Sequence, residues 1–408
     1  MRFPDPRPSP TLLSSRTGMD ISHARILIVD DSPLIRELIG ACLQTEGYRN
    51  IGYAENGQDA LDVIEETEPD LIILDLEMPV MDGFTLCQKL RSKDATRDIP
   101  ILVESGLDSA TDITRAFEYG ASDMIAKPIK KYEITARTRV HLEHHFFVRA
   151  LTDYHNRVAS ELEQARHLQF DLCPSDDDLA LLEHRYGVRI RSRYEPSSEL
   201  GGDIWGVLPV SDSQLAFYIA DFSGHGVAAA LNTFRLQTCL ATLSGHYDRP
   251  AVLLNRLNTF LYRILKSGSY ATMLFACLDL EAGLIRFAGA GSQPPLHMGN
   301  QPPASLQFCN SHGMPLGLRP DWEYQEYTVP FDPDMQFMLY SDALIEVEDS
   351  TGAHLGESGL CLDMQDILAG PERADPVKAL AGRFASRLGS QAPDDLTIFL
   401  IARTGRDA

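Results

Sequence analysis

Between Arg25 and about His141, short β-branched runs alternate with helix-like segments. The runs are "RILIVDD", "NIGYAEN", "DLIILD", "IPILVESG" and "DMIAKP", and helical stretches such as "SPLIRELIGACLQTEG" follow them. Because each strand is followed by a helix, this alternation predicts a doubly wound, five-stranded parallel sheet in an α/β domain. Ligands of such sheets bind at the carboxyl ends of the strands, so we expect a functional site there.

Carboxylates stand at two of these strand ends. Asp30 and Asp31 follow the first run, and Asp75 ends the third. Three carboxylates above one sheet edge would repel one another by several kcal/mol at an effective dielectric of about 20, unless a cation lies between them. Because sites built only of oxygen ligands favour Mg2+, we expect Asp30, Asp31 and Asp75 to bind this ion.

A hydroxyl and a lysine stand at two further strand ends. Lys127 precedes Pro128 and could pair with an incoming phosphoryl group, which the hydroxyl of Ser105 could hydrogen-bond. Asp75 is then the expected nucleophile, carrying an acyl phosphate. A single strand-end aspartate more often just caps the next helix. The joint order and spacing of these residues favours a phosphorylation site instead.

In these motifs the chain closely resembles the response-regulator receiver family. The resemblance covers residues 24–141 and rests on "VDDS", "LDLEMPVMDG", "ESG" and "KP". It implies that a cognate histidine kinase or phosphotransfer protein phosphorylates Asp75, with Ser105 and Lys127 as the switch residues.

Two further positions bear on this switch. Met124 lies three residues before the lysine, where the family often has a Tyr or Phe that swings inward on phosphorylation. We therefore expect the switch to rely on Ser105 and on surface repacking. Glu77, two residues past the phosphoacceptor, adds a negative charge that could alter the lifetime of the aspartyl phosphate.

From Ile129 to Cys173 the chain has no Gly or Pro, and apolar residues recur in steps of three and four. This spacing predicts a heptad seam on one long helix. We expect residues 142–173 to form a helical linker that makes a dimeric coiled coil, and the chain to be a homodimer; a helix lying on a neighbouring domain is the alternative. The seam residues are Phe147, Leu151, Tyr154, Val158, Ala165, Leu168 and Leu172, with one slip near Glu161.

Beyond Pro174 the pattern changes to strand pairs joined by short turns. Strands are expected in "VRIRSRYEP", "QLAFYIAD", "ATMLFACLDL", "GLIRFAGAG", "MQFMLYSD" and "LTIFLIA", with helical stretches such as "GVAAALNTFRLQTCLATLSG" between them. Strand pairs of this kind predict an antiparallel α+β domain over residues 174–405.

Aspartates again stand near strand ends in this second domain. They are Asp203 in "SELGGDIWGV", Asp221 in "IADFSGHG", Asp342 in "YSDALIE", and Asp394 and Asp395 in "APDDLTIF". No Ser-His-Asp or Cys-His arrangement accompanies them. Separate carboxylates suit a two-metal site, with ions about 3.5–4 Å apart that activate a water molecule for attack on phosphorus. Mn2+ or Mg2+ is the expected metal.

The order of these motifs resembles the metal-dependent, protein phosphatase 2C-like superfamily. The bacterial branch with the sporulation phosphatase and the stress-response phosphatases is the most similar, from about Glu161 to Arg403. This resemblance implies an antiparallel β-sandwich flanked by helices, and a phosphorylated anti-sigma-factor antagonist as substrate. It also implies metal ligands: Asp221 bridging both ions near the Phe222 carbonyl, Asp342 and Asp394 on one ion, Asp203 orienting water, and Asp395 within the metal site.

Four positions depart from the branch pattern without removing a presumed ligand. Gly206 replaces a frequent Asp, Ala343 replaces the Gly of "SDG", and Gly289 and Ser292 replace the Asn and the His of "NAGH". They bear on substrate contacts and metal affinity. His225 in the glycine turn is interpreted as a turn residue, and "GAGSQPP" is no phosphate loop.

Two histidines, His141 and His145 in "HLEHH", have helical metal-ligand spacing. Because we expect no carboxylate or cysteine partner close to them, a metal site is not predicted there.

Charge and cysteine content restrict the function further. The 408 residues suit two or three domains, with 44% hydrophobic residues, and carry a formal net charge of -22. This charge opposes binding to nucleic acid or an anionic membrane. Seven cysteines without a C-x-x-C pair indicate reduced thiols in a cytoplasmic protein. The proline-rich residues 1–23 are interpreted as a disordered tail, and Met19 could be the true start.

These observations predict a two-component response regulator. Phosphorylation of Asp75 would control, through the linker, a metal-dependent protein serine/threonine phosphatase. The alternative is a degenerate phosphatase domain that acts as a phosphorylation-regulated adaptor for a sigma factor or anti-sigma factor. The carboxylates at 203, 221, 342 and 394 argue against it, because a pure adaptor has no need of them. A nucleotide cyclase is disfavoured by the absence of a phosphate loop.

Overall fold

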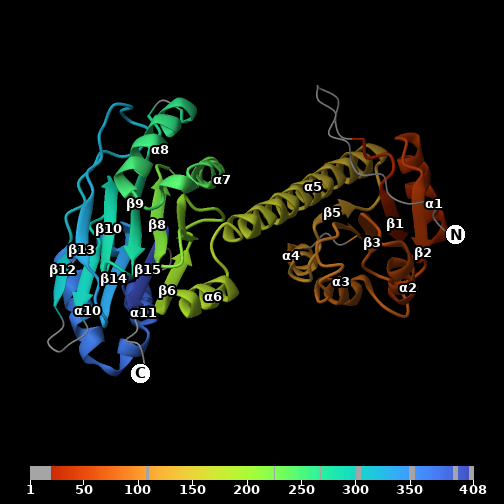
Figure 1. The fold of residues 1–408 in the computed structure, drawn as a ribbon. Coiled ribbons are helices and arrows are strands. Elements are labelled where there is room, and N and C mark those ends of the chain that lie inside the picture. Colours follow the sequence, from red (N-terminus) through yellow and green to blue (C-terminus); the bar gives the residue numbers. More distant parts are fainter. Residues whose placement is uncertain are drawn as a thin grey trace. The chain divides into compact units, whose positions relative to one another are not determined.

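The computed structural model describes residues 20–106, 110–224, 226–266, 268–299, 305–348, 354–388 and 394–403, without the side chains of 110–113. The chain forms two compact units, Met1–Val158 and Ala159–Ala408 (Figure 1). Met19, most of the predicted tail and His225 lie outside the described residues.

The first unit contains the predicted parallel sheet. Its strands pair in the order β2-β1-β3-β4-β5, all parallel. Each strand falls within a predicted run, which confirms the doubly wound fold. The strands are β1 (Arg25–Val29), β2 (Asn50–Ala54), β3 (Leu71–Asp75), β4 (Ile101–Ser105) and β5 (Asp123–Ala126).

Helices cover both faces of this sheet, as the continuous apolar strands require. Along β1, Ile26 and Ile28 contribute to one core, while Leu27 and Val29 contribute to the other. The acid-bearing loops lead directly into helices: Asp82 caps α3, accepting a hydrogen bond from the Thr85 amide. The helices are α1 (Pro33–Thr45), α2 (Gly57–Thr67), α3 (Gly83–Arg91), α4 (Ala110–Glu118) and α5 (Lys131–Phe170).

Helix α5 is a single helix of 40 residues, as the absence of Gly and Pro predicts. Ile134, Leu142 and Phe146 on it are buried in a core of the first unit. Farther along, seam residues such as Leu151 and Tyr154 are exposed, at 58% and 64%. Phe147 and Leu168 are exposed as well, whereas Leu172 packs against a core of the second unit. The coiled coil stays a prediction.

The second unit is an antiparallel β-sandwich. Its strands are β6 (Val188–Glu195), β7 (Asp203–Pro209), β8 (Gln214–Phe222), β9 (Ala271–Asp279), β10 (Leu284–Ala290), β11 (Leu296–Gly299), β12 (Leu306–Phe308), β13 (Tyr327–Pro330), β14 (Met335–Tyr340) and β15 (Leu396–Arg403). They form two five-stranded sheets, ordered β13-β10-β9-β8-β7 and β12-β11-β14-β15-β6. The predicted sandwich is confirmed.

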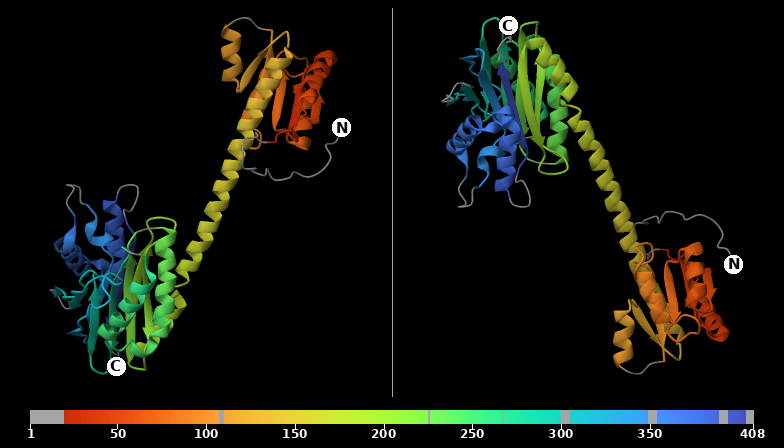
Figure 2. Two further views of the ribbon diagram at one scale, coloured as in Figure 1. Left: turned by 90° about the horizontal axis from the view of Figure 1, so that it is seen from above. Right: turned by 90° about the horizontal axis from the view of Figure 1, so that it is seen from below.

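Helices cover both outer faces of the sandwich (Figure 2). Alternation along β8 sends Phe217 between the two sheets and Tyr218 toward α7 and α8. On the other sheet, Met338 packs toward α10 and α11 while Phe337 faces the opposite sheet. The helices are α6 (Asp176–Tyr186), α7 (Val227–Thr242), α8 (Pro250–Ile264), α9 (Ala343–Glu346), α10 (Gly356–Ala369) and α11 (Pro376–Arg387).

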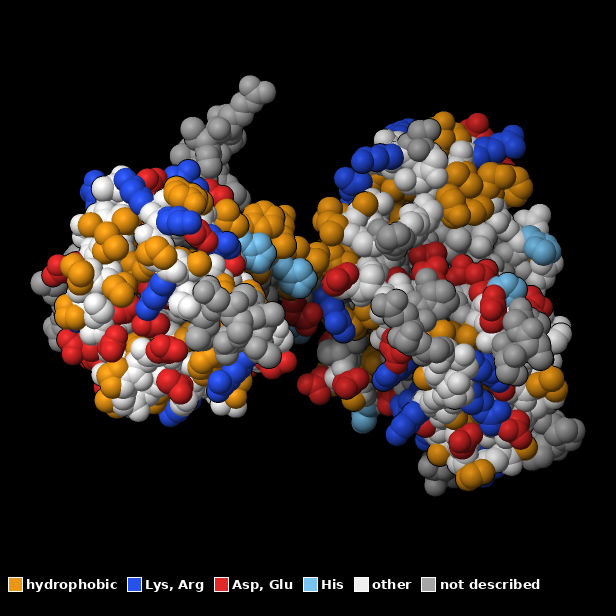
Figure 3. Space-filling model, turned by 180° about the vertical axis from the view of Figure 1, so that it is seen from behind, with side chains coloured by type: hydrophobic (Ala, Val, Ile, Leu, Met, Phe, Trp, Pro, Cys, Tyr) orange, Lys and Arg blue, Asp and Glu red, His pale blue; other side chains and the backbone are white. Residues whose placement is uncertain are grey.

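Several elements of the second unit were not indicated by the sequence pattern. Strands β11, β12 and β13 are only 3 or 4 residues long, too short for a period-two pattern. Helix α6 begins in an acidic run, where Ser175 and Asp178 form a capping box. On the face drawn in Figure 3, acidic side chains gather near the middle of the second unit.

Candidate functional site

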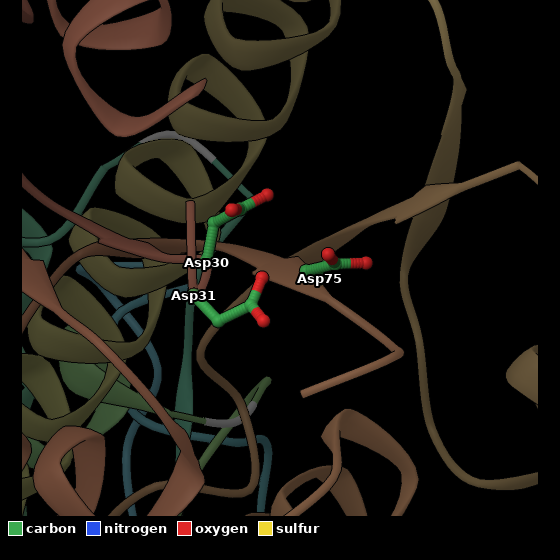
Figure 4. A group of neighbouring side chains, drawn as sticks. All are labelled: Asp30, Asp31 and Asp75. Atoms are coloured by element: carbon green, nitrogen blue, oxygen red, sulfur yellow. The ribbon is translucent and has the colours of Figure 1, made fainter. Parts of the chain in front are cut away.

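The carboxylates of the first unit converge as predicted. Asp30 and Asp31 follow β1, and Asp75 ends the adjacent strand β3. One carboxylate oxygen of each lies within 4.8 Å of the others, with Asp30 and Asp75 buried and Asp31 exposed (Figure 4). This arrangement of three oxygen donors, one of them open to solvent, fits a cation such as Mg2+.

Lys127 lies against this cluster. Its Nζ is 2.6 Å from Asp75 Oδ2 and 3.5 Å from Asp30 Oδ2. Burial alone would lower the pKa of Lys127, but the hydrogen bond and charge of Asp75 outweigh it and raise that pKa. Burial raises the pKa of Asp30. The lysine therefore partly neutralises the cluster.

The other predicted residues of this site also lie near Asp75 or at the strand ends. Ser105 is buried at the end of β4, and its carbonyl accepts a hydrogen bond from the Lys127 amide at 2.9 Å. Glu77 is exposed, and its amide donates to Asp75 Oδ1 at 3.3 Å. Met124 packs against the core under α3 rather than facing solvent as a free switch group.

Glu104 is a functional candidate that the sequence reasoning missed. It is fully buried opposite Asp75 in the β3–β4 ladder, and neither carboxylate oxygen has a hydrogen-bond partner. Burial raises the pKa of Glu104 to about 8, with the charge of Asp30 adding to the effect. The signal was present in "ILVESG", where a charged residue interrupts an apolar strand.

The second acidic cluster lies at one end of the sandwich. Asp203 and Asp221 face each other directly in the β7–β8 ladder. Together with Asp342, they line a pocket of about 30 Å³ that also contains Thr272 and Ser292. This volume is enough for water molecules or ions but not for a phosphopeptide. A substrate would thus contact the pocket only at its mouth.

These carboxylates raise one another's pKa. Burial and the charge of Asp221 raise the pKa of Asp203 well above its usual value. Burial, with the charge of Asp342, raises the pKa of Asp221 to about 7. Burial and the charge of Asp394 raise the pKa of Asp342. Within the described part of the chain, no lysine or arginine forms an ion pair with these three, so the pocket is suited to cations.

Asp394 and Asp395 have different surroundings. Asp394 is exposed, and its Oδ1 accepts a hydrogen bond from the Asp395 amide at 2.8 Å. Asp395 is buried, and its carboxylate accepts from the Ser197 amide and hydroxyl and from the amides of Gly202 and Asp203, at 2.6–3.3 Å. These four bonds commit Asp395 to the turn before β7, and its assignment as a metal ligand stays a prediction that they do not favour.

A second layer of hydroxyls holds the acidic residues in place. Thr397 Oγ1 donates to Asp203 Oδ2 at 2.5 Å. Ser341, next to Asp342, donates its hydroxyl to the Asp395 carbonyl at 2.9 Å and accepts from the Thr397 amide at 2.8 Å. The ends of β7, β14 and β15 are thereby linked, which sequence reasoning could not have detected.

Two glycines of this region are required by close contacts. A Cβ on Gly202 would lie 2.8 Å from the Phe222 carbonyl oxygen and 3.0 Å from Asp221 Oδ1, so the predicted backbone ligand adjoins the acidic pocket. A Cβ on Gly206 would lie 2.7 Å from the Tyr218 ring. The ring therefore explains why Gly206 stands where the family branch often has an aspartate.

Of the two histidines in "HLEHH", His141 has a carboxylate partner. His141 Nε2 lies 3.0 Å from Asp123 Oδ2, and Arg137 contacts both oxygens of the same carboxylate at 2.7 Å. The interpretation that no carboxylate is near them is wrong, because Asp123 at the start of β5 is distant in sequence. Among the described residues, no histidine belongs to a group of three or more side chains that lie close enough together to hold a metal ion.

The fold and the acidic sites define a class of protein in which an α/β domain with an acidic site is joined to a β-sandwich with a second acidic site. Two family models match in agreement with this. Residues 26–139 match the response regulator receiver domain, and residues 211–404 match Stage II sporulation protein E, SpoIIE. The chain belongs to the response regulators and carries a receiver domain and a SpoIIE-type, protein phosphatase 2C-like output domain.

Individual relatives match over parts of the chain. The transcriptional regulator RpaA of Synechocystis is 41% identical over 115 residues, which are 28% of this chain and 47% of RpaA. A probable transcriptional regulatory protein of Picosynechococcus is 32% identical over 219 residues, 50% of this chain and 84% of that protein. The chain thus spans about half the length of RpaA.

A solved structure resembles the output domain in fold. The SiaA-PP2C domain of Pseudomonas aeruginosa has a TM-score of 0.52 and 19% identity, covering 61% of this chain and 98% of that domain. Among the helices that the structure describes, none has the length and apolar character needed to cross a membrane.

Proposed function

We propose that this response regulator is a metal-dependent protein serine/threonine phosphatase controlled by phosphorylation of Asp75. One observation carries the proposal: Asp203 and Asp221 face each other at a pocket that Asp342 also lines, with the pKa of all three raised. Keeping such mutually repelling carboxylates in place is costly unless they bind cations. The SpoIIE-type family model supports the same activity.

The residues that would hold the ions are those that the resemblance to the phosphatase superfamily implies. In the output domain, two Mn2+ or Mg2+ ions would bind to Asp221, Asp342 and Asp394, near the Phe222 carbonyl. When bound, such ions activate water for attack on phosphorus and stabilise the charge that develops. Asp203, held by Thr397, would orient the attacking water.

In the receiver domain, Asp30, Asp31 and Asp75 would bind Mg2+. Asp75 would accept the phosphoryl group from a histidine kinase or a phosphotransfer protein. Lys127, already 2.6 Å from Asp75, and Ser105 at the end of β4 are placed to contact that group. The added charge would bias the packing of the linker helix and so regulate hydrolysis.

We further propose a phosphorylated anti-sigma-factor antagonist as substrate and a homodimer formed through α5. The SpoIIE-type family supports the substrate class, and the exposed apolar stripe on α5 supports the dimer. Sedimentation velocity of the native chain and of Leu151→Asp tests the dimer. We expect the native chain to sediment as a dimer and Leu151→Asp to sediment as a monomer. A native chain that stays monomeric at about 50 μM, a concentration at which weak association is still detected, would contradict the dimer.

The decisive experiment is the rate of para-nitrophenyl phosphate hydrolysis as a function of Mn2+ concentration. Native protein is expected to show metal-dependent turnover that Asp221→Asn reduces by about 100-fold or more, as expected for loss of a bridging ligand. Asp279→Asn is the matched control, since Asp279 is a buried carboxylate paired with Arg286 outside the pocket. Beryllofluoride, added to each protein, tests whether the receiver controls the rate.

Turnover that is independent of metal, or that is unchanged in Asp221→Asn, would overturn the proposal that the output domain is a metal-dependent phosphatase. Folded native protein that shows no turnover above that variant would instead favour the adaptor. Equal rates with and without beryllofluoride would refute control by the receiver.

A further inference from the structure

The end of helix α5 contains a buried amide that faces the catalytic turn. Gln169, the penultimate residue of α5, is 3% exposed. Its Nε2 donates to the Gly201 carbonyl at 2.7 Å, and its Oε1 accepts from the Gly201 amide at 3.2 Å. Both polar groups of one glycine are thus satisfied by one side chain. A buried, reciprocal pair of this kind specifies geometry, because breaking it leaves buried groups unsatisfied.

Gly201 begins the turn that leads to Asp203. Asp395 holds the same turn from the opposite side through the amides of Gly202 and Asp203, at 2.6 Å and 3.3 Å. Asp203 itself starts strand β7 opposite Asp221. The turn before Asp203 is therefore held by two partners, Asp395 just before β15 and Gln169 of the linker helix, while Thr397 bonds the Asp203 carboxylate itself.

The same end of α5 also contacts helix α7, which follows the Asp221 turn. Gln169 Nε2 is 3.5 Å from the hydroxyl of Thr233 on α7. Gln237, farther along α7, donates its amide to the Leu172 carbonyl at 2.9 Å. The two glutamines differ in one respect: both anchor the end of the linker, but only Gln169 reaches the turn before Asp203.

We propose that Gln169 is a positioning residue, through which the linker helix sets the place of Asp203 at the metal pocket. The role rests on the proposed function of the output domain. A change in the position of α5 would displace the Gly201 backbone and thereby Asp203, without any contact between α5 and the substrate. Gln169 touches neither metal nor substrate, so it acts through Gly201.

The test compares Gln169→Met with Gln237→Met in the full-length protein. Methionine keeps the length and packing of glutamine but removes its hydrogen bonds. Mn2+ affinity is measured by isothermal titration calorimetry, which needs no catalysis. Asp203 is the ladder partner of Asp221, a proposed Mn2+ ligand, so displacing Asp203 should also disturb that ligand. We therefore expect Gln169→Met to weaken Mn2+ binding about tenfold or more, and Gln237→Met to change it less than twofold. Hydrogen–deuterium exchange is expected to accelerate in peptides spanning 196–204 only in Gln169→Met.

The turnover parameters supply a second readout. Because Asp203 is proposed to orient water rather than to bind substrate, Gln169→Met should lower kcat while leaving KM within about twofold. Equal effects of the two variants on affinity and on exchange would overturn the role, because both would then act only through stability. An unchanged Mn2+ affinity in Gln169→Met would overturn it as well.

This outcome is separable from that of the proposed function. If the native chain binds Mn2+ but hydrolyses no phosphomonoester, the phosphatase proposal fails, while the affinities and exchange rates of the two variants still decide the role of Gln169. If the native chain binds no Mn2+, both proposals are overturned.

Discussion

The receiver and output domains both collect aspartates at strand ends, but they balance the charge in different ways. In the receiver, Lys127 lies 2.6 Å from Asp75, and the three carboxylates come within 4.8 Å of one another. In the output domain, Asp203 and Asp221 face each other with no lysine or arginine paired to them among the described residues. One cluster has an internal cation, and the other has none among the described residues.

This difference teaches how similar residues acquire different chemistry. A carboxylate beside a lysine has part of its charge offset within the protein, and the lysine can pass to the incoming phosphoryl group. Carboxylates that only repel one another are instead suited to act as metal ligands, because a bound cation offsets their charge. The local sequence around Asp75 and Asp221 is alike, so the distinction comes from the neighbours that the fold supplies.

The largest expected effect is on the stability of the metal-free protein. The folded-state pKa of Asp221 is raised to about 7, above its unfolded value, so the metal-free domain loses stability as pH rises from about 4 toward 7. In EDTA at pH 8, Asp221→Asn should therefore stabilise the output domain, by on the order of 4 kcal/mol at most. Both tryptophans, Trp205 and Trp322, belong to this domain, so tryptophan fluorescence follows its unfolding.

Asp75→Asn provides the comparison in the receiver. In this variant the relief of repulsion is offset by loss of the ion pair with Lys127. The calorimetric transition of the receiver should therefore shift by less than half as much as that of the output domain in Asp221→Asn. Mn2+ should stabilise the native output domain and not Asp221→Asn. A destabilised Asp221→Asn in EDTA would show that the carboxylates are balanced by something other than metal.

A smaller effect is expected at Glu104. Its folded-state pKa of about 8 lies above the unfolded value, so the receiver should lose stability between pH 5 and pH 8. Glu104→Gln removes this dependence, which amounts to on the order of 3 kcal/mol across that range. Calorimetry at several pH values measures the slope. Glu55→Gln, which removes an exposed carboxylate, should leave the slope unchanged; equal slopes in the native chain and Glu104→Gln would contradict the prediction.

The smallest effect tests the internal cation. Lys127→Met should destabilise the metal-free receiver by about 2 kcal/mol, because it leaves the carboxylates of Asp30 and Asp75 buried without a cationic partner. Mg2+ should then stabilise the variant more than the native domain. Lys93→Met removes an exposed ion pair with Glu65 and should cost less than about 0.5 kcal/mol. If Mg2+ stabilised the native chain and Lys127→Met equally, the proposed difference in charge balance between the two clusters would be contradicted.

Much of the fold could be predicted from the sequence, because its signals are local. Short β-branched runs predict the five receiver strands, and a long segment without Gly or Pro predicts the linker helix. In the output domain the longer strands β8, β9 and β15 were equally visible. Strands β11 to β13 were not, since strands of 3 or 4 residues carry no reliable alternation.

The candidate sites divide in the same way. Asp30, Asp31 and Asp75 converge as their strand ends predict, because parallel strands bring their carboxyl ends to one edge. Asp394 and Asp395 are neighbours in sequence, yet one is exposed and the other accepts four hydrogen bonds in the interior. Sequence reasoning could not separate them, since burial and donors depend on residues nearly 200 positions away.

The pattern of residues along the chain therefore established the two domains, the helix between them and the acidic strand ends, all of which depend on periodicity and motif spacing. The three-dimensional fold decided which carboxylates are balanced by a lysine, which are balanced by backbone amides and which are left unbalanced. It also placed Gln169 beside Gly201 and Glu104 beside Asp75. The physical reason is that pKa, burial and hydrogen bonding are set by contacts through space, and the partners concerned are far apart in sequence.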